Sequence, residues 1–437
     1  MVQLDSLGIE QAHYGLQCTL CGAQHSPDPF QLRCNTPHEP ALLRAIYDLR
    51  LNIKPHLPGI FQFSDWLPVE RWFDVAGKPV TYASDRLAQH FKLEQLYVSF
   101  NGYWPERHAY LSTGSFKELE APSVLAHVPE SCQQTLVLAS AGNTGRAFAT
   151  LCSTLRIPLC LVLPEQNLQA IWSKEPFHPC VQLVVVGGDG DYSDAIALAQ
   201  LISQLEGYFP EGGAANVARR DGMGLTVVDA AVTLGRIPDH YFQAVGSGTG
   251  GVSAWEANLR LRQDGRFGGH QMKLHLAQNA PFTPMVTAWK QGKRQIAPLG
   301  EAAAKAQIDG VAAKVLTNRS PAYAIAGGVY DALSATDGQM YGVTNAEARR
   351  AQDLFEALEG IDISPASGVA VAALGQAAAA GCIGREDVVL LNITSGGVNR
   401  IRQTYSLHYL RPALTFLPRD IRPEIVKARL GRNLCKI

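Results

Sequence analysis

Short apolar runs and longer amphipathic stretches alternate through the middle of the chain. Within residues 111–236, the runs TLVLAS, PLCLVLP and VQLVVVGG alternate with the stretches NTGRAFATLCSTLRI and DYSDAIALAQLISQLEG. Continuous apolar runs are typical of strands buried in a parallel sheet, and amphipathic stretches predict the helices that connect them. This order therefore predicts βαβ units.

A second series of the same kind follows towards the C-terminus. It contains YFQAVGSGTGG with the helix VSAWEANLRLR, and then KLHLAQ, SGVAVAALGQAAAAG and VVLLNITSGG. Residues 1–110 look irregular, and residues 281–344 carry helices and loops whose order the pattern does not fix. We expect an α/β protein of two lobes, each an open, mostly parallel sheet flanked by helices, with a cofactor at the carboxyl ends of strands.

Composition narrows the class of protein. The chain has 437 residues, of which 46% are hydrophobic and 18% charged, so it can bury a large core in more than one domain. A net charge of -1 without a basic run argues against nucleic acid as a partner. The N-terminal residues resemble no signal peptide, no apolar window could span a bilayer, and nine scattered cysteines suit a reducing compartment. We expect a soluble, cytoplasmic homo-oligomer.

Two glycine-rich turns lie where a predicted strand runs into a helix. In the first, LVLASAGNTGRAFA, the side chains of Ser140, Asn143 and Thr144 and the backbone amides form a neutral donor cluster. Such donors suit a carboxylate or a phenolate.

The second turn, FQAVGSGTGGVSAWEA, places Gly246, Gly248 and Gly251 in a GxGxxG pattern. A dinucleotide site would also require an acidic residue at the end of the next strand, but KLHLAQNA ends in Gln278 and Asn279. We therefore favour a phosphate cradle at the helix N-terminus, with a turn needed only for packing as the alternative.

A single lysine, Lys117, follows the flexible turn Thr113–Phe116 in LSTGSFKELEAPS. The apolar run VVLLNI ends in Thr394 and Ser395, whose hydroxyls could cap a helix or bind a heteroaromatic nitrogen without protonating it. A lysine amine, a phosphate cradle, an Asn-Ser-Thr loop and a neutral hydroxyl together predict a site for pyridoxal phosphate.

These motifs resemble the threonine synthase group of fold-type II pyridoxal phosphate enzymes, whose fold is like that of the tryptophan synthase β-subunit. TGSFK matches the lysine motif of this group, SAGNTG its asparagine loop, and GVTNAEA and SPASGVAVAAL its later blocks. SFKELEA, GSGTGGVSAWEANLRL and LNITSGG are most similar to cysteate synthases, which make L-cysteate from O-phospho-L-serine and sulfite. The resemblance covers most of the chain from about Cys18 onward.

The resemblance implies a role for each matched residue. Lys117 would be the Schiff-base lysine and the general base, Asn143 would hold the phenolic oxygen of the cofactor, and Ser140 and Thr144 would lie near the substrate carboxylate. The ring nitrogen would meet Thr394 according to a Thr-x-x-Gly pattern, or Ser395 according to a Ser-x-Gly pattern; we favour Thr394. The cofactor phosphate would be bound by the second glycine-rich turn, that is by Ser247, Gly248, Thr249, Gly250 and Gly251.

The reaction implied is a β-replacement that converts O-phospho-L-serine and sulfite to L-cysteate and phosphate. Arg219, in the Asn-x-x-Arg-x-x-Gly spacing that starts at Asn216, would bind the substrate phosphate, with Arg220 and Arg146 as further candidates. For each arginine a salt bridge without a catalytic role is the alternative. Threonine synthase acting on O-phosphohomoserine is the second interpretation, and another nucleophile would use the same residues.

Departures from the threonine synthase pattern favour the first interpretation. Lys117 is followed by Glu118 and Leu119 instead of Asp-Arg, Ser140 by Ala141 instead of a second serine, and Ser364 stands where a glutamate often precedes the proline. A module that has lost catalysis would lack the lysine, and a nicotinamide oxidoreductase would need the missing acidic residue.

Cys18, Cys21, Cys34 and His38 could supply four zinc ligands, as in a small ribbon. The second pair is Cys-x3-His with a proline inside, so we interpret the group as the remnant of a ribbon and predict no metal, with zinc as the alternative. Cys152 and Cys160 lie in apolar runs and are expected in the core.

Three regions are expected from these patterns. Residues 1–60 would form the N-terminal segment with the ribbon-like cysteines. Residues 61–110 and 236–437 would form a large α/β domain. Residues 111–235 would form a small α/β domain that carries the lysine and the asparagine loop.

Overall fold

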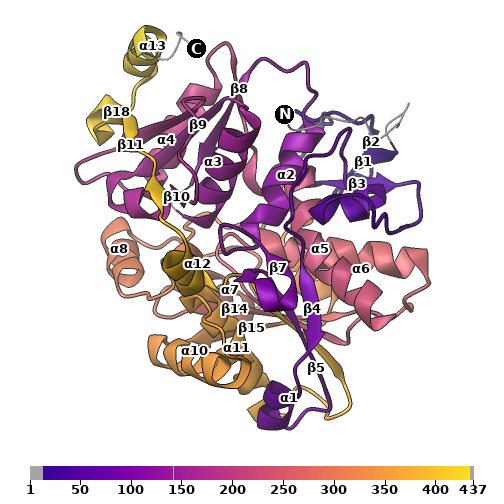
Figure 1. Cartoon of the computed structure of the whole chain (residues 1–437). Coiled ribbons are helices and arrows are strands. Elements are labelled where there is room, and N and C mark those ends of the chain that lie inside the picture. Colours follow the sequence, from indigo (N-terminus) through magenta and orange to yellow (C-terminus); the bar gives the residue numbers. More distant parts are fainter. Residues whose placement is uncertain (1–12, 141, 434–437) are drawn as a thin grey trace. The chain divides into compact units, whose positions relative to one another are not determined.

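The computed structural model describes residues 13–140 and 142–433, and it divides into two units, each built on one parallel or mostly parallel sheet (Figure 1). Among the described residues, the smaller unit comprises Val128–Gly213 and residues 402–433, and the larger comprises residues 13–127 and Ala214–Ile401. Ala141 of the asparagine loop and residues 1–12 of the expected N-terminal segment lie outside the described residues.

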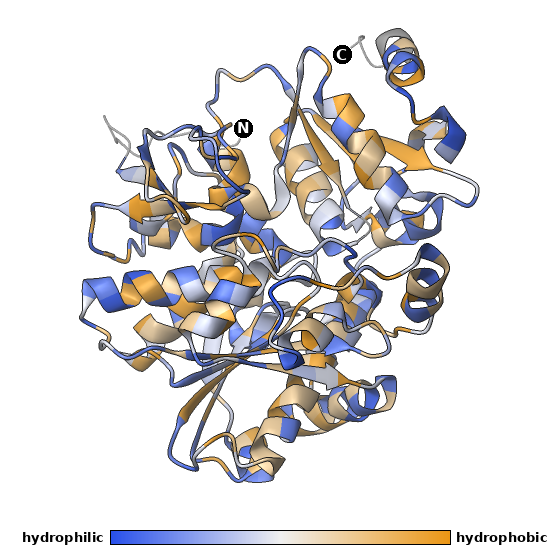
Figure 2. Cartoon of the chain, turned by 180° about the vertical axis from the view of Figure 1, so that it is seen from behind, coloured by the Kyte–Doolittle hydropathy of each residue, from blue (hydrophilic) through white to orange (hydrophobic). Residues whose placement is uncertain are grey.

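The sheet of the smaller unit is parallel throughout, in the order β12-β8-β9-β11-β18. All six residues of β9 are buried, as expected for a strand with helices on both faces. Figure 2 shows the strands of this sheet mostly in the hydrophobic colour. The elements of this unit are β8 Thr135–Ala139, α3 Asn143–Leu155, β9 Leu159–Pro164, β10 Trp172–Ser173, β11 Val181–Val186, α4 Tyr192–Ser203, β12 Tyr208–Pro210, β17 His408–Tyr409, β18 Pro412–Phe416 and α13 Pro423–Asn433.

The larger unit contains a six-stranded sheet in the order β15-β14-β13-β16-β5-β4, in which only the edge strand β4 is antiparallel. Its strands are β4 Val80–Ala83, β5 Gln95–Phe100, β13 His240–Ala244, β14 Lys273–Asn279, β15 Gln339–Val343 and β16 Val388–Ile393. Its helices are α1 Asp85–Phe91, α2 Lys117–His127, α5 Val217–Leu234, α6 Thr249–Asp264, α7 Pro284–Lys290, α8 Glu301–Asp309, α9 Val329–Ala335, α10 Asn345–Glu359, α11 Pro365–Ala379 and α12 Val398–Thr404, the last of which runs across the boundary of the units.

Smaller elements complete the larger unit. A three-stranded antiparallel sheet has the order β2-β1-β3, and β6 pairs with β7. Their bounds are β1 Tyr14–Cys18, β2 Gln24–His25, β3 Leu43–Tyr47, β6 Tyr103–Trp104 and β7 Ala109–Tyr110. Among the described residues, no helix has the length and hydropathy needed to cross a membrane.

The predicted α/β class and the mostly parallel sheets are confirmed. Two local predictions were wrong. Residues 13–110 hold seven strands where we expected irregular structure, because short strands such as Tyr14–Cys18 lie among many turn residues. Residues 281–344 hold the strand β15 besides helices and loops, although its sequence QMYGV is short and contains a glycine.

The division into units differs from the expected domain boundaries at both ends of the expected small domain and in the C-terminal segment. Helix α2 packs on α5, and α5 packs on α6, so residues 111–127 and 214–235 belong to the larger unit. The segment after Ile401 belongs to the smaller unit because β18 adds to the edge of its sheet beside β11.

Candidate active site

Lys117 is the first residue of helix α2, and Glu118 holds the turn that precedes it. One carboxylate oxygen of Glu118 accepts hydrogen bonds from the amide and hydroxyl of Ser112 at 2.9 and 2.8 Å. The other accepts from the amide and hydroxyl of Thr113 at 2.6 and 2.7 Å. Gly114 has a φ of +67°, which disfavours any residue with a side chain. The turn is therefore fixed immediately before the lysine.

The turn around Thr394 lies directly against the Lys117 turn. The amide of Phe116 donates to the carbonyl of Thr394 at 2.9 Å, and the Ser395 hydroxyl donates to the carbonyl of Gly114 at 2.7 Å. The structure thus brings Thr394 and Ser395 together with the lysine turn. Because the proton of Ser395 Oγ is used for Gly114, the Thr394 hydroxyl is the better candidate to meet a ligand.

Ser115, two residues before Lys117, has a fully buried hydroxyl. This hydroxyl has no hydrogen-bond partner among the described residues. A buried hydroxyl without a partner costs free energy, so a ligand that satisfies it would be stabilised here.

The glycine-rich turn lies at the same edge of the sheet as Thr394. It follows β13, and Thr394 follows the adjacent parallel strand β16. Helix α6 begins at Thr249, and its first intrahelical bond runs from the Val252 amide to the Gly248 carbonyl at 3.1 Å. The amides of residues 249–251 therefore have no intrahelical acceptor, and the first turn contains no acidic residue. Such a helix N-terminus suits an anion.

Glycine is required at the start of α6 because the helix packs closely on the sheet. A Cβ added to Gly250 would lie 2.1 Å from Gln243 Nε2, and one added to Gly251 would lie 2.6 Å from a methyl carbon of Leu276. The hydroxyls of Ser247 and Thr249, in the same turn, lie 2.9 Å apart. The packing alternative thus accounts for these two glycines without conflicting with a phosphate cradle.

The end of strand β14 does not provide the acidic residue that a dinucleotide site would need. Gln278, at the end of β14, accepts hydrogen bonds through Oε1 from the amides of Met285 and Val286 at 2.9 and 3.2 Å. Its carbonyl oxygen is used to hold the start of α7, and no acidic side chain takes the place of a ribose acceptor on this strand.

Glu120 is a residue that the sequence reasoning missed. Its carboxylate is completely buried, with Oε2 3.1 Å from Lys117 Nζ and Oε1 3.1 Å from Arg219 Nη2. The sequence could have indicated this pair, because Glu120 follows Lys117 by three residues in a helical stretch, and this spacing places both side chains on one face.

Arg219 reaches Glu120 because α5 and α2 approach closely. A Cβ at Gly222 would lie 2.3 Å from the carbonyl oxygen of Leu119, so only glycine permits this approach. Met223, on the same helix, lies with its sulfur 3.5 Å from Lys117 Nζ. The spacing from Asn216 to Gly222 therefore sets the place of Arg219: Asn216 caps α5, and Gly222 brings the helix against α2.

The two other candidate arginines have structural partners. Arg220 is 1% exposed and lies 2.9 Å from the carboxylate of Glu256. Burial alone would raise the pKa of Glu256, but Arg220 and Arg44 hold that pKa below its ordinary value. Arg146 donates to the side chain of Asn143 at 2.7 Å and lies over the ring of Trp172. Of the two candidate arginines in the larger unit, Arg219 shares a carboxylate partner, Glu120, with Lys117, whereas Arg220 pairs with Glu256.

The residues of the asparagine loop belong to the smaller unit. Ser140 Oγ accepts from the amide of Gly145 at 2.8 Å, which fixes the loop at the start of α3. Asn143 is the first residue of that helix and Thr144 the second. Within their unit they lie together after β8, as the sequence predicted. The buried Cys152 and Cys160 of this unit are core residues, and burial raises the pKa of both thiols.

Comparison with known proteins identifies relatives that are pyridoxal-phosphate dependent enzymes. The sequence model of the pyridoxal-phosphate dependent enzymes matches residues 86–395. The cysteate synthase of Methanocella paludicola is 50% identical over 97% of this chain and 99% of its own length. That of Methanosarcina acetivorans is 47% identical over 94% of this chain and 99% of its own length.

Solved structures with the same fold include two racemases. A pyridoxal 5'-phosphate-dependent aspartate racemase, 16% identical, covers 72% of this chain and 89% of its own with a TM-score of 0.51. Maize serine racemase, 12% identical, covers 74% of this chain and 90% of its own with a TM-score of 0.55. At these identities the likeness concerns the fold alone. From the family match and the near full-length relatives, we conclude that the chain belongs to the pyridoxal-phosphate dependent enzymes and, among them, to the cysteate synthase family.

Proposed function

We propose that the protein uses pyridoxal phosphate to convert O-phospho-L-serine and sulfite to L-cysteate and phosphate. The observation that carries this proposal is its similarity to cysteate synthases along nearly the whole chain. The arrangement of Lys117, Glu120 and Thr394 in the larger unit supports it, because it offers an amine, a carboxylate and a neutral hydroxyl at adjoining turns.

The residues present fit the cofactor. The amides of residues 249–251 and the hydroxyls of Ser247 and Thr249 would hold its phosphate, and the backbone of Gly248 would complete the cradle. Lys117 would hold it covalently, and the Thr394 hydroxyl would contact its ring nitrogen. When bound, the cofactor supplies an electron sink for the α-carbon of an amino acid.

A hydroxyl at the ring nitrogen would leave that nitrogen neutral, which suits elimination and replacement at the β-carbon. The roles of Asn143 at the phenolic oxygen, and of Ser140 and Thr144 at the substrate carboxylate, rest on the family resemblance. Ser395 would not contact the cofactor; its hydrogen bond to the Gly114 carbonyl would stabilise the turn before Lys117.

Lys117 would take the α-proton of the substrate and return it at the end of the reaction. Glu120 accepts a hydrogen bond from Nζ and would orient the amine for this transfer. Arg219 would bind the phosphate group of the substrate, since a guanidinium forms charge-assisted hydrogen bonds to a dianion. If Arg219 turned to the substrate phosphate, Glu120 would keep its hydrogen bond with Lys117 alone.

A panel of substrates tests the proposal. Phosphoserine and O-phosphohomoserine are each supplied with sulfite, a thiol, an amine or water alone, and the products are identified by mass. Cysteate from phosphoserine and sulfite supports the proposal. Threonine from O-phosphohomoserine without any cysteate would replace it by threonine synthase. The proposal also includes a cytoplasmic homo-oligomer, whose size light scattering would measure.

A further inference from the structure

The segment that joins β1 to β3 has almost no apolar core of its own. Within residues 19–40, all of which the structure describes, no side chain is buried and only the two-residue strand β2 is regular. A stretch of this length in a compact fold needs another source of order, since burial cannot provide it.

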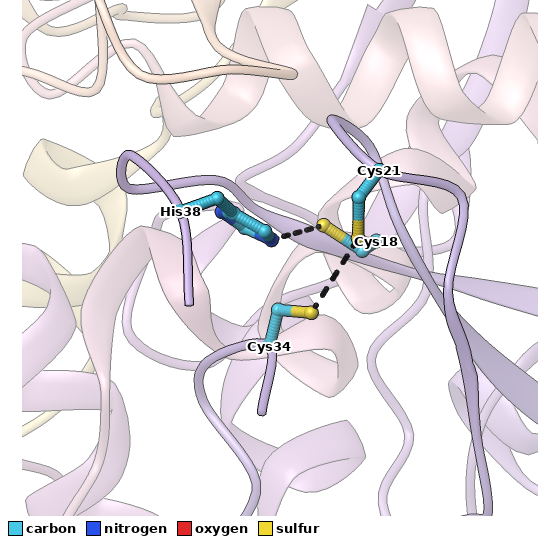
Figure 3. A group of neighbouring side chains, drawn as sticks. All are labelled: Cys18, Cys21, Cys34 and His38. Atoms are coloured by element: carbon cyan, nitrogen blue, oxygen red, sulfur yellow. Dashed lines mark hydrogen bonds between the residues drawn. The ribbon is translucent and has the colours of Figure 1, made fainter. Parts of the chain in front are cut away.

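Four donor atoms converge at this segment, three from residues 19–40 and one from Cys18 at the end of β1 (Figure 3). The sulfurs of Cys18, Cys21 and Cys34 and a ring nitrogen of His38 all lie within 4.8 Å of one another. The sulfurs of Cys21 and Cys34 are 3.8 Å apart, and Cys18 Sγ is 3.3 Å from His38 Nε2. A tetrahedral zinc ion with bonds of about 2.3 Å to sulfur and 2.0–2.1 Å to nitrogen would separate two sulfurs by about 3.8 Å and a sulfur and a nitrogen by about 3.6 Å.

Backbone amides stabilise the three sulfurs in a regular way. The amides of Leu20 and Cys21 face the sulfur of Cys18, and that of Ala23 faces the sulfur of Cys21. The Thr36 amide donates to Cys34 Sγ at 3.4 Å. Each sulfur thus receives the amide two residues later. Gly22 follows Cys21 with a φ of +72°, which permits the tight turn.

A hydrogen bond also fixes the tautomer of His38 in the form that can bind a metal through Nε2. Its Nδ1 donates to the carbonyl of Glu39 at 2.6 Å, so Nε2 carries the lone pair that faces the sulfurs. A second hydrogen bond of this kind is what orients metal-bound histidines. His25 Nε2 lies 3.4 Å from Cys34 Sγ but does not belong to the group of four mutually close donors.

We propose that Cys18, Cys21, Cys34 and His38 bind one zinc ion, and that His25 donates a hydrogen bond to the Cys34 thiolate without binding the metal. This replaces the expectation of a metal-free remnant. With four protein ligands the ion has no open position, which is the pattern of a structural site. It would order residues 19–40 in place of an apolar core.

Contacts of Thr19 connect this site to the glycine-rich turn. Thr19 Oγ1 donates to the carbonyls of Leu42 and Ala326 at 2.8 and 3.0 Å, and Gly327 must be glycine because a Cβ there would lie 2.7 Å from the same hydroxyl. The loop from Ala322 to Val329 returns to the turn, where the Ala322 amide donates to the carbonyl of Ser247 at 2.9 Å. Loss of the ion would therefore also loosen the proposed phosphate cradle.

Metal content of the purified full-length protein tests the proposal. We expect one zinc per chain in the wild type, in His25→Ala and in Cys382→Ser, a matched control with an exposed cysteine outside the group. Cys34→Ser and His38→Ala should lose the zinc, and their melting temperature should fall. Equal zinc in His38→Ala and wild type, or loss in His25→Ala with retention in His38→Ala, would overturn the assignment.

A measurement on the wild type covers the case in which a ligand variant does not fold. The protein is stripped of metal with a chelator, reduced, and titrated with Co²⁺, whose absorption reports thiolate ligands and tetrahedral geometry. We expect thiolate-to-cobalt absorption that saturates at one ion per chain, and protection of three thiols from a thiol-reactive reagent. Absence of both, or a Cys21–Cys34 disulfide in the protein as purified, would refute the zinc site. The readouts are independent of cysteate formation, so failure of one proposal leaves the other standing.

Discussion

Glu120 Oε2 lies 3.1 Å from Lys117 Nζ, one turn further along helix α2. The second oxygen of the same buried carboxylate lies 3.1 Å from Arg219 on α5. A buried carboxylate between two cations interacts favourably with both, although its single negative charge offsets only one of the two positive charges. It also links the amine that we propose for proton transfer to the arginine that we propose for the substrate phosphate.

Removing the charge of Glu120 should impair turnover. In Glu120→Gln the shape is kept, but Lys117 and Arg219 lose their shared anion. Loss of a charge-assisted hydrogen bond worth about 1.5–3 kcal/mol should lower kcat roughly 10-fold or more. Steady-state kinetics and the cofactor content per chain are to be measured side by side. Glu356→Gln, an exposed change on α10, is the control. An unchanged kcat in Glu120→Gln would refute the orienting role.

Gly250→Asp should weaken cofactor binding severely. The new carboxylate would face a phosphate dianion, and its Cβ would collide with Gln243 Nε2. The matched control is Gly300→Asp at the N-cap of α8, where a Cβ meets nothing within 4 Å. Cofactor affinity follows from absorbance titration, and circular dichroism shows whether the variant is folded. If folded Gly250→Asp bound the cofactor as well as wild type, the phosphate site would have to lie elsewhere.

Thr394→Val and Ser395→Ala should have different effects. The first removes the hydroxyl proposed for the ring nitrogen, so the absorbance of the bound cofactor and kcat should change while the melting temperature stays close to wild type. The second removes the 2.7 Å bond to Gly114, so stability should fall by about 0.5–1.5 kcal/mol. Reversed effects, with the spectrum changed only in Ser395→Ala, would assign the ring nitrogen to Ser395.

Acid should destabilise the fold through His127. Burial lowers the pKa of His127 to about 3, and its Nε2 lies 2.6 Å from the hydroxyl of Tyr14. The unfolded chain has a histidine pKa near 6.5, so it binds the proton first as the pH falls. The stability that comes from a neutral His127 is therefore present above about pH 6.5 and is lost from there towards pH 3, by about 1.4 kcal/mol per pH unit.

The variant His127→Gln cannot titrate and can still hydrogen-bond Tyr14. Urea unfolding between pH 7 and pH 5 should give a shallower loss of stability in the variant than in wild type. Equal slopes for both proteins would contradict the assigned pKa.

The sequence was informative wherever local pattern decides the structure. The runs around β8, β9 and β13 predicted strands because their apolar residues are continuous, and the turns after them were identified from their glycines. The ion pair of Glu120 with Arg219 could not be predicted, since it depends on the close packing of α2 and α5 at Gly222. The convergence of Cys34 and His38 on Cys18 depends on a loop path without periodicity, so spacing alone left zinc and a remnant cluster as alternatives.

The choice of Thr394 over Ser395 illustrates the same limit. Sequence motifs pointed to both residues, whereas the structure gives the Ser395 hydroxyl a backbone partner in a turn that lies 281 residues earlier in the chain. Which of two neighbouring hydroxyls is engaged depends on sheet order, and no local pattern contains that information.

The most direct test of the central claim is the product formed from phosphoserine and isotopically labelled sulfite. Wild-type protein loaded with pyridoxal phosphate should release one phosphate for each labelled cysteate detected by mass spectrometry, and Lys117→Ala should form nearly none. Lys305→Ala, an exposed lysine on α8, serves as the control and should behave as wild type. Phosphate release without cysteate, or wild-type cysteate formation by Lys117→Ala, would contradict the account.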